Sequence, residues 1–119
     1  MRLQDAKQMS VSQNLKLKPN TDFEVWANIA APYEGTDALL PSEVHNIRMD
    51  YPFPVVRGDY NVYPIYPCTT LKGLIAETQR VFRSLWDAGL SDAPHCLEDF
   101  VIECIIPHPN NLATIVIGS

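Results

Sequence analysis

The most regular hydrophobic pattern in the chain runs from residue 70 to residue 88. Apolar side chains recur there at helical spacing and fall within a stripe roughly 120° wide. The positions of this stripe are Leu71, Leu74, Ile75, Thr78, Phe82, Leu85 and Trp86. Thr69 or Thr70 can cap the amino end, and Gly89 suits the left-handed position that follows the last turn. The pattern therefore predicts one long amphipathic helix over residues 70–88.

Strands are indicated before this helix by the alternation of apolar and polar residues. Residues 23–29 alternate clearly and residues 11–18 more weakly, and the turn-forming residues 19–22 lie between them. We expect these two runs to pair as an antiparallel hairpin. Residues 31–42 are then expected to form a loop or lid.

The segment that leads to the helix is rich in proline and tyrosine. Residues 46–51 alternate and predict a third strand, although Pro41 offers a competing start for a short helix. Residues 51–68 hold four prolines and four tyrosines. Because proline cannot donate a hydrogen bond to a neighbouring strand, any strand in this segment lies at a sheet edge or is broken.

Two apolar and β-branched runs follow the helix, over residues 98–106 and 111–117. The turn formers between them predict a hairpin whose register follows from matching the apolar faces. The expected pairs on the buried face are Phe100–Ile117, Ile102–Ile115, Cys104–Ala113 and Ile106–Asn111. The sequence therefore predicts the α+β class, with a mainly antiparallel sheet packed against one long amphipathic helix and ending in a C-terminal β-hairpin. Residues 1–119 are expected to form a single domain.

Charge and composition narrow the classes of partner. The chain has 119 residues and a formal net charge of −5, which argues against nucleic acid because phosphates require clustered Lys and Arg. No apolar run is long enough to span a membrane, and the first residues lack the apolar centre of a secretory signal. Three cysteines, an odd number, fit a reducing compartment. We therefore expect a cytoplasmic protein that binds neither nucleic acid nor membrane.

Residues 95–108 hold two cysteines and two histidines and raise the question of a metal or thiol site. Zinc ligands lie about 2.0–2.3 Å from one ion, whereas Cys96 and Cys104 are separated by roughly 26 Å if the strand between them is extended. Cys104 is expected in the core. Cys68 is the better candidate nucleophile, because the dipole of the following helix lowers a thiol pKa. We expect no metal, no cofactor and no catalytic residue.

Aromatic residues among the prolines are the main positive indication of function. Tyrosine and tryptophan combine a large contact area with a hydrogen-bonding group and are frequent at interfaces. In a strand over residues 60–66, one face can pack on the helix while the other meets a partner or lines a cleft. A competing interpretation is that the rings only cover the core at a proline-broken edge. The expected binding residues are Tyr60, Tyr63, Tyr66, Arg57 and Trp26.

The sequence thus predicts a small acidic binding domain without catalytic activity, acting through a protein surface. The expected partner is another protein or a second copy of the chain, in an inhibitor, immunity or assembly role. The alternative is a small-molecule pocket, or a small cysteine- or histidine-dependent enzyme, between helix and sheet. That alternative places Cys68, His45 or His95 in a cleft.

Overall fold

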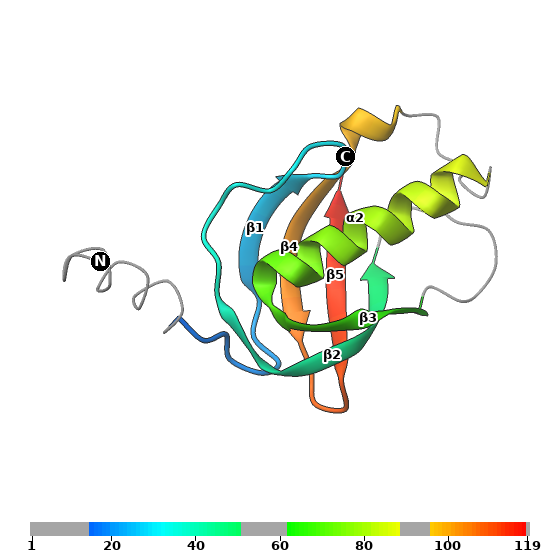
Figure 1. The fold of residues 1–119 in the computed structure, drawn as a ribbon. Coiled ribbons are helices and arrows are strands. Elements are labelled where there is room, and N and C mark those ends of the chain that lie inside the picture. Colours follow the sequence, from blue (N-terminus) through cyan, green and yellow to red (C-terminus); the bar gives the residue numbers. More distant parts are fainter. Residues whose placement is uncertain (1–14, 51–61, 89–95, 119) are drawn as a thin grey trace, which may run out of the picture.

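The computed structural model describes residues 15–50, 62–88 and 96–118. Its strands are β1 (Phe23–Asn28), β2 (Leu39–Asp50), β3 (Val62–Thr70), β4 (Val101–Pro107) and β5 (Leu112–Gly118). The helix α2 spans Leu71–Asp87, and a short 3₁₀ helix, η1, spans Leu97–Asp99. Figure 1 shows α2 lying across one face of a curved sheet.

The strands form one sheet in the order β1-β4-β5-β2-β3. β2 and β5 run parallel, and the other neighbouring pairs are antiparallel. The predicted α+β class is confirmed, and the C-terminal hairpin of β4 and β5 lies in the interior of the sheet. β1 and β3 form the two edges, so β3 is the proline-containing edge strand that the sequence predicts.

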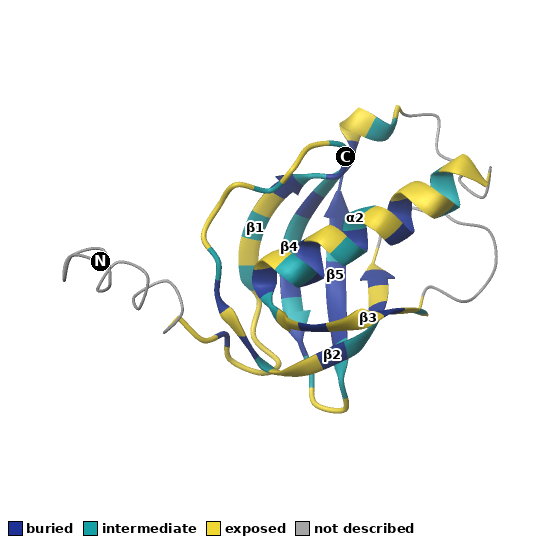
Figure 2. Cartoon of the chain, viewed as in Figure 1, coloured by how far each residue is buried: buried dark blue, intermediate teal, exposed yellow. Residues whose placement is uncertain are grey.

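The core lies between α2 and the face of the sheet that the helix covers. The predicted helical stripe is buried at Leu71, Leu74, Ile75 and Phe82, and Val81 is buried at its margin. The sheet contributes rows of fully buried apolar side chains (Figure 2). These are Ile47, Met49, Ile102, Ile105, Ala113, Ile115 and Ile117, each 0% exposed.

An aromatic cluster holds the later turns of α2 against the start of β4. The ring centroid of Phe100 lies 5.1 Å from that of Phe82 and 5.6 Å from that of Trp86. The contact with Trp86 is edge-on, a geometry that adds about 0.5–1.5 kcal/mol to the burial of the rings. Phe100 is thus a core residue, as the sequence predicts.

The amino end of α2 is closed by side chains and backbone from two directions. Thr70 is the N-cap, and its hydroxyl oxygen accepts from the backbone N–H of Gly73 at 3.2 Å. A carboxylate oxygen of Asp37 accepts from the N–H of Lys72 at 3.0 Å. The Ala38 carbonyl accepts the N–H of Leu71 at 2.8 Å. The end of the segment predicted as a loop therefore completes the first turn of the helix.

The register predicted for the C-terminal hairpin is wrong. Ile106 pairs with Thr114 and Cys104 with Val116, while Ile102 pairs with Ile117. The pairing shifts between Ile102 and Cys104, because Glu103 is an extra residue in β4 and forms a bulge. Beyond such a bulge the face of every side chain is reversed, so Ile105 is buried while Cys104 and Ile106 are only partly buried on the opposite face.

The hairpin predicted between residues 11–18 and 23–29 is also wrong in the part that the structure describes. Lys16 forms a parallel bridge with Leu39 at the start of β2. The turn after it places Asn20 in the left-handed region, at φ 58°, and the Asn20 N–H donates to the Pro107 carbonyl at 2.6 Å. That bond brings the chain beside β4, so β1 pairs with β4 instead.

The strand predicted over residues 46–51 is confirmed up to Asp50 and is longer than expected. Pro41 lies inside β2, so the competing helix is wrong. In β3, Ile65 is buried and Val62 and Tyr66 are exposed, as the alternation predicts. Tyr51, Arg57, Tyr60, Gly89 and His95 lie outside the described residues.

Candidate functional site

The face of the sheet opposite α2 carries polar and partly buried side chains. Register places Arg48 of β2 beside Thr114 of β5 and Val62 of β3. Asn46 and Leu112 form the adjacent row, nearer the β4–β5 turn. We call this surface the open face. It differs from the covered face because its residues alternate with the buried rows along each strand.

A chain of hydrogen bonds runs across the open face. The Arg48 guanidinium donates from Nη2 to Thr114 Oγ1 at 3.0 Å, and Thr114 Oγ1 lies 2.7 Å from His108 Nε2. His108 Nδ1 lies 2.8 Å from the amide oxygen of Asn20. That oxygen can only accept, so Nδ1 carries the proton, and in a neutral imidazole Nε2 accepts from the threonine hydroxyl. The network therefore fixes the orientation of His108, Thr114 and Arg48 together.

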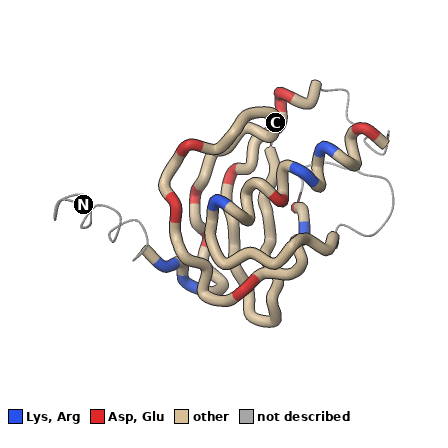
Figure 3. The backbone as a smooth tube through the Cα atoms, in the orientation of Figure 1, with Lys and Arg blue, Asp and Glu red and all other residues tan. Residues whose placement is uncertain are grey.

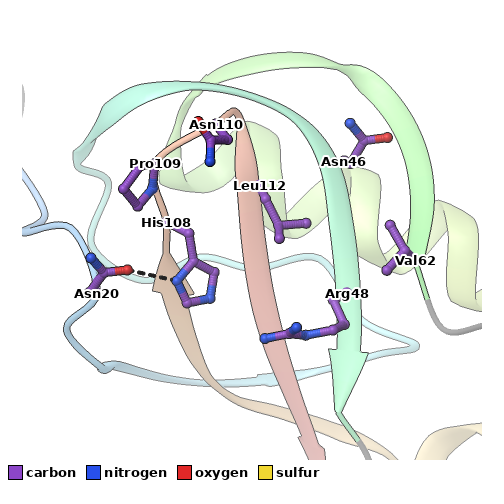
Figure 4. Close-up of a pocket in the computed structure, with 8 residues that line it drawn as sticks. All are labelled: Asn20, Asn46, Arg48, Val62, His108, Pro109, Asn110 and Leu112. Atoms are coloured by element: carbon purple, nitrogen blue, oxygen red, sulfur yellow. Dashed lines mark hydrogen bonds between the residues drawn. The ribbon is translucent and has the colours of Figure 1, made fainter.

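A hollow of about 500 Å³ lies beside this network (Figure 4). Its lining comes from the turn before β1, from β2 and β3, and from the β4–β5 turn with the start of β5. The lining residues are Asn20, Asn46, Arg48, Val62, His108, Pro109, Asn110 and Leu112. Figure 4 shows Arg48 reaching from β2 toward His108 across β5.

The β4–β5 turn that walls this hollow is held firmly by backbone bonds. Asn110 and Asn111 both adopt left-handed backbone, at φ 67° and 63°, which asparagine tolerates better than most residues. The Asn111 carbonyl accepts the N–H groups of His45 and Asn46, and its side-chain amide donates to the Glu43 carbonyl. The turn is therefore bound to β2, a contact that no local pattern in the sequence predicts.

Two of the three cysteines have surroundings that favour the neutral thiol. Burial raises the pKa of Cys68, and the nearby carboxylates of Glu77 and Glu43 raise it further. Burial and negative charge favour the neutral thiol of Cys68 and so oppose the effect of the helix dipole, on which its choice as the better candidate nucleophile rested. Burial also raises the pKa of Cys104, together with several carboxylates around it.

Of the residues named for a cysteine–histidine cleft, the structure describes Cys68 and His45, while His95 lies outside the described residues. Cys68 is buried, and its thiol donates to the Tyr66 carbonyl. His45 Nε2 lies 2.6 Å from a carboxylate oxygen of Glu43. Within residues 15–50, 62–88 and 96–118, no group of three or more histidine, cysteine and acidic side chains could hold a metal ion.

Among the predicted binding residues that the structure describes, Trp26 has the most unusual backbone. It lies in β1 at a bulge, where the pairing with β4 shifts between Glu24 and Ala27. Its φ is 54°, a left-handed conformation that is uncommon and strained for a bulky residue. The side chain is 64% exposed. An edge strand thus holds a large indole in solvent at some conformational cost.

Tyr66 is exposed, and it also takes part in polar contacts that link β3 to α2. Its backbone N–H donates to Glu77 Oε1 at 2.8 Å, and the Arg80 guanidinium lies 5.3 Å from the centre of its ring. Arg80 donates two hydrogen bonds to the Glu77 carboxylate, at 2.9 and 3.0 Å. Tyr63 is half-buried against the core, and burial raises its pKa.

The predicted binding residues are therefore not gathered at one place. Trp26 lies on β1 and Tyr63 and Tyr66 lie on β3, at opposite edges of the sheet. Arg57 and Tyr60 belong to the part of the chain that is not described. The polar network of the open face was missed, because its members are spread from Asn20 to Thr114 and only the strand pairing brings them together.

No family model, curated protein or solved structure matches this chain. In the described parts, no helix is both long and apolar enough to cross a membrane.

Proposed function

We propose that this protein is a non-catalytic binding domain that recognises a protein partner through the β1 edge, with Trp26 as the anchor. The main support for this proposal is that the Trp26 indole is exposed and its backbone adopts a left-handed conformation. Tryptophan is enriched among residues that dominate interface energies, and bulges frequently redirect side chains at functional places. Burying this indole in a partner removes a large apolar surface from water.

Charge supports a basic partner surface. Glu24 is exposed on the same strand as Trp26 and pairs with Cys104 of β4, beside the partly buried Glu103. Arg83 of α2 donates from Nη2 to the Ala30 carbonyl, just after β1, at 3.4 Å, so one basic side chain lies at the carboxyl end of this strand. Figure 3 shows where the acidic and basic residues lie along the backbone. With a net charge of −5, the protein attracts cationic surfaces over distances of about a Debye length.

Self-association by strand pairing at β3 is the less favoured form of the same proposal. Pro64 has no N–H, and the N–H of Tyr66 is already taken by Glu77. Prolines and occupied donors protect an edge strand from pairing with another chain. If the partner is a second copy of the chain, we propose that it binds through side chains and not by strand pairing.

The three cysteines are all unpaired, which supports a cytoplasmic location.

Affinity capture from cytosolic extract, with quantitative mass spectrometry, tests the role of Trp26. The immobilised protein should retain a basic partner at low salt and release it as the salt concentration rises. Trp26→Gly should weaken binding of that partner by at least roughly 30-fold, because loss of such an anchor costs about 2 kcal/mol or more.

Tyr66→Ala is the matched control, since it removes an exposed aromatic side chain from the opposite edge. It should retain the same partner at nearly unchanged affinity. Equal retention by the Trp26→Gly variant, with circular dichroism showing both variants folded, would contradict the proposal.

A further inference from the structure

We propose that the hollow on the open face binds a small organic anion, with its carboxylate or phosphate group on Arg48 and a flat apolar body against Val62 and Leu112. This site is separate from the β1 edge and does not depend on the proposed function. The class of ligand follows from the charge of Arg48, from the orientation of its N–H donors and from the apolar side chains of the lining.

Charge sets the sign of the ligand. Arg48 is the formally charged side chain of the lining. It is exposed, and none of the described carboxylates forms an ion pair with it. Asp50 follows two residues later on the same strand and lies opposite Val116, outside the lining. A guanidinium presents five N–H donors in a fixed plane that matches carboxylate and phosphate oxygens.

The guanidinium is already oriented for this role. Its Nη2 donates to the hydroxyl of Thr114, and that hydroxyl is also hydrogen-bonded to His108. Thr114 is only 4% exposed. That bond uses one donor, so the other N–H groups remain for an anion. Because the arginine is positioned before binding, less conformational entropy is lost when the ligand arrives.

The rest of the hollow fits a small molecule rather than a bare ion. Its volume of about 500 Å³ lies within the range of small-molecule sites. The side-chain amides of Asn46 and Asn110 supply neutral donors, while Val62 and Leu112 supply apolar contacts. Val62 is one of the large apolar side chains that stay exposed, and a flat ligand body would cover it.

Titration of the ¹⁵N-labelled full chain with benzoate and phenyl phosphate, followed by NMR, tests the site. We expect shifts at the Asn46 and Asn110 side-chain amides and at Arg48 Nε, with dissociation constants of roughly a millimolar. Acetate and inorganic phosphate, which lack the apolar body, should bind about tenfold or more weakly. Equal binding of the bare and the aryl anions would overturn the apolar part of the proposal.

Two arginine variants complete the experiment. Arg48→Gln should weaken binding of both aryl anions at least about tenfold, as expected for loss of a charge-assisted hydrogen bond. Arg83→Gln, on α2, should leave binding unchanged. If Arg48→Gln does not fold, Arg48→Lys keeps the charge without the planar fork and should bind more weakly than the wild type. Shifts confined to residues of α2, or binding that survives the loss of Arg48, would overturn the site.

Discussion

At the scale of single residues, the three cysteines differ in exposure and in their surroundings. Cys96 is exposed, Cys104 is partly buried and Cys68 is buried. Burial raises the pKa of the last two, and thiolate is the form that reacts. The chemistry of each thiol therefore follows from its position in the fold rather than from the histidines that neighbour it in sequence.

Alkylation of the native protein with iodoacetamide near pH 8 should consequently modify Cys96 first. Cys68 should react only on the timescale of local opening, because its thiol is buried and mostly protonated. Cys104 is partly buried and should react at an intermediate rate. Mass spectrometry of peptides from timed samples measures the three rates, and the denatured protein supplies the reference. Rapid modification of Cys68 in the native state would restore the thiol-enzyme hypothesis.

At the scale of elements, one carboxylate adds polar links between β3 and α2. Glu77 accepts from Arg80 and from the Tyr66 amide, and its side chain is only 16% exposed. The hydrogen bonds from Arg80 lower the pKa of Glu77 below its ordinary value of 4.5. This carboxylate therefore stabilises the fold fully above pH 4.5, and its contribution is lost as the pH falls through the lowered pKa.

Glu77→Gln should accordingly reduce the free energy of unfolding by about 1 kcal/mol near neutral pH. The difference from the wild type should shrink as the pH falls below 4.5. Urea unfolding at several pH values measures both quantities. Asp87→Asn is the control: it removes a negative charge from the carboxyl end of the same helix and should be neutral or slightly stabilising. A pH-independent effect of Glu77→Gln would contradict the assignment.

The elements also show which features a sequence can predict. The helix was predictable because its stripe is local and periodic, and the Thr70 cap follows from the same segment. The bulge at Glu103 was not, because an extra residue in β4 is defined only against its partners β1 and β5. That one residue decides whether Cys104 or Ile105 faces the core. The Arg48–Thr114–His108 network was unpredictable for the same reason, since it depends on the parallel pairing of β2 with β5.

At the scale of the whole molecule, β5 joins two pairs of strands. β1 and β4 lie on one side of it and β2 and β3 on the other. Its inward side chains, Ala113, Ile115 and Ile117, are all 0% exposed. The two halves of the sheet therefore share one core, and they are expected to unfold in a single cooperative transition.

Ile115→Ala should lower the free energy of unfolding by about 2–5 kcal/mol, because it leaves a cavity in this shared core. Amide hydrogen exchange should quicken to a similar degree in β1 and in β3, the two distant edges. Val116→Ala, at the next position but on the open face, should cost less than half as much. Faster exchange at one edge alone would show that the halves unfold separately.

The contact of Asp37 with the amino end of α2 also bears on the order of folding. Asp37 precedes Lys72 by 35 positions, so the first turn of the helix is not completed by its own neighbourhood. Forming a first helical turn is the unfavourable step of helix formation. A peptide of residues 70–88 contains the apolar stripe of the helix. It lacks Asp37 and Ala38, which accept hydrogen bonds from the backbone N–H groups of Lys72 and Leu71. We therefore expect the first turn of the helix to form stably only after β2 has brought Asp37 and Ala38 into place. The element that is most predictable from the sequence thus depends on one of the least regular segments of the chain.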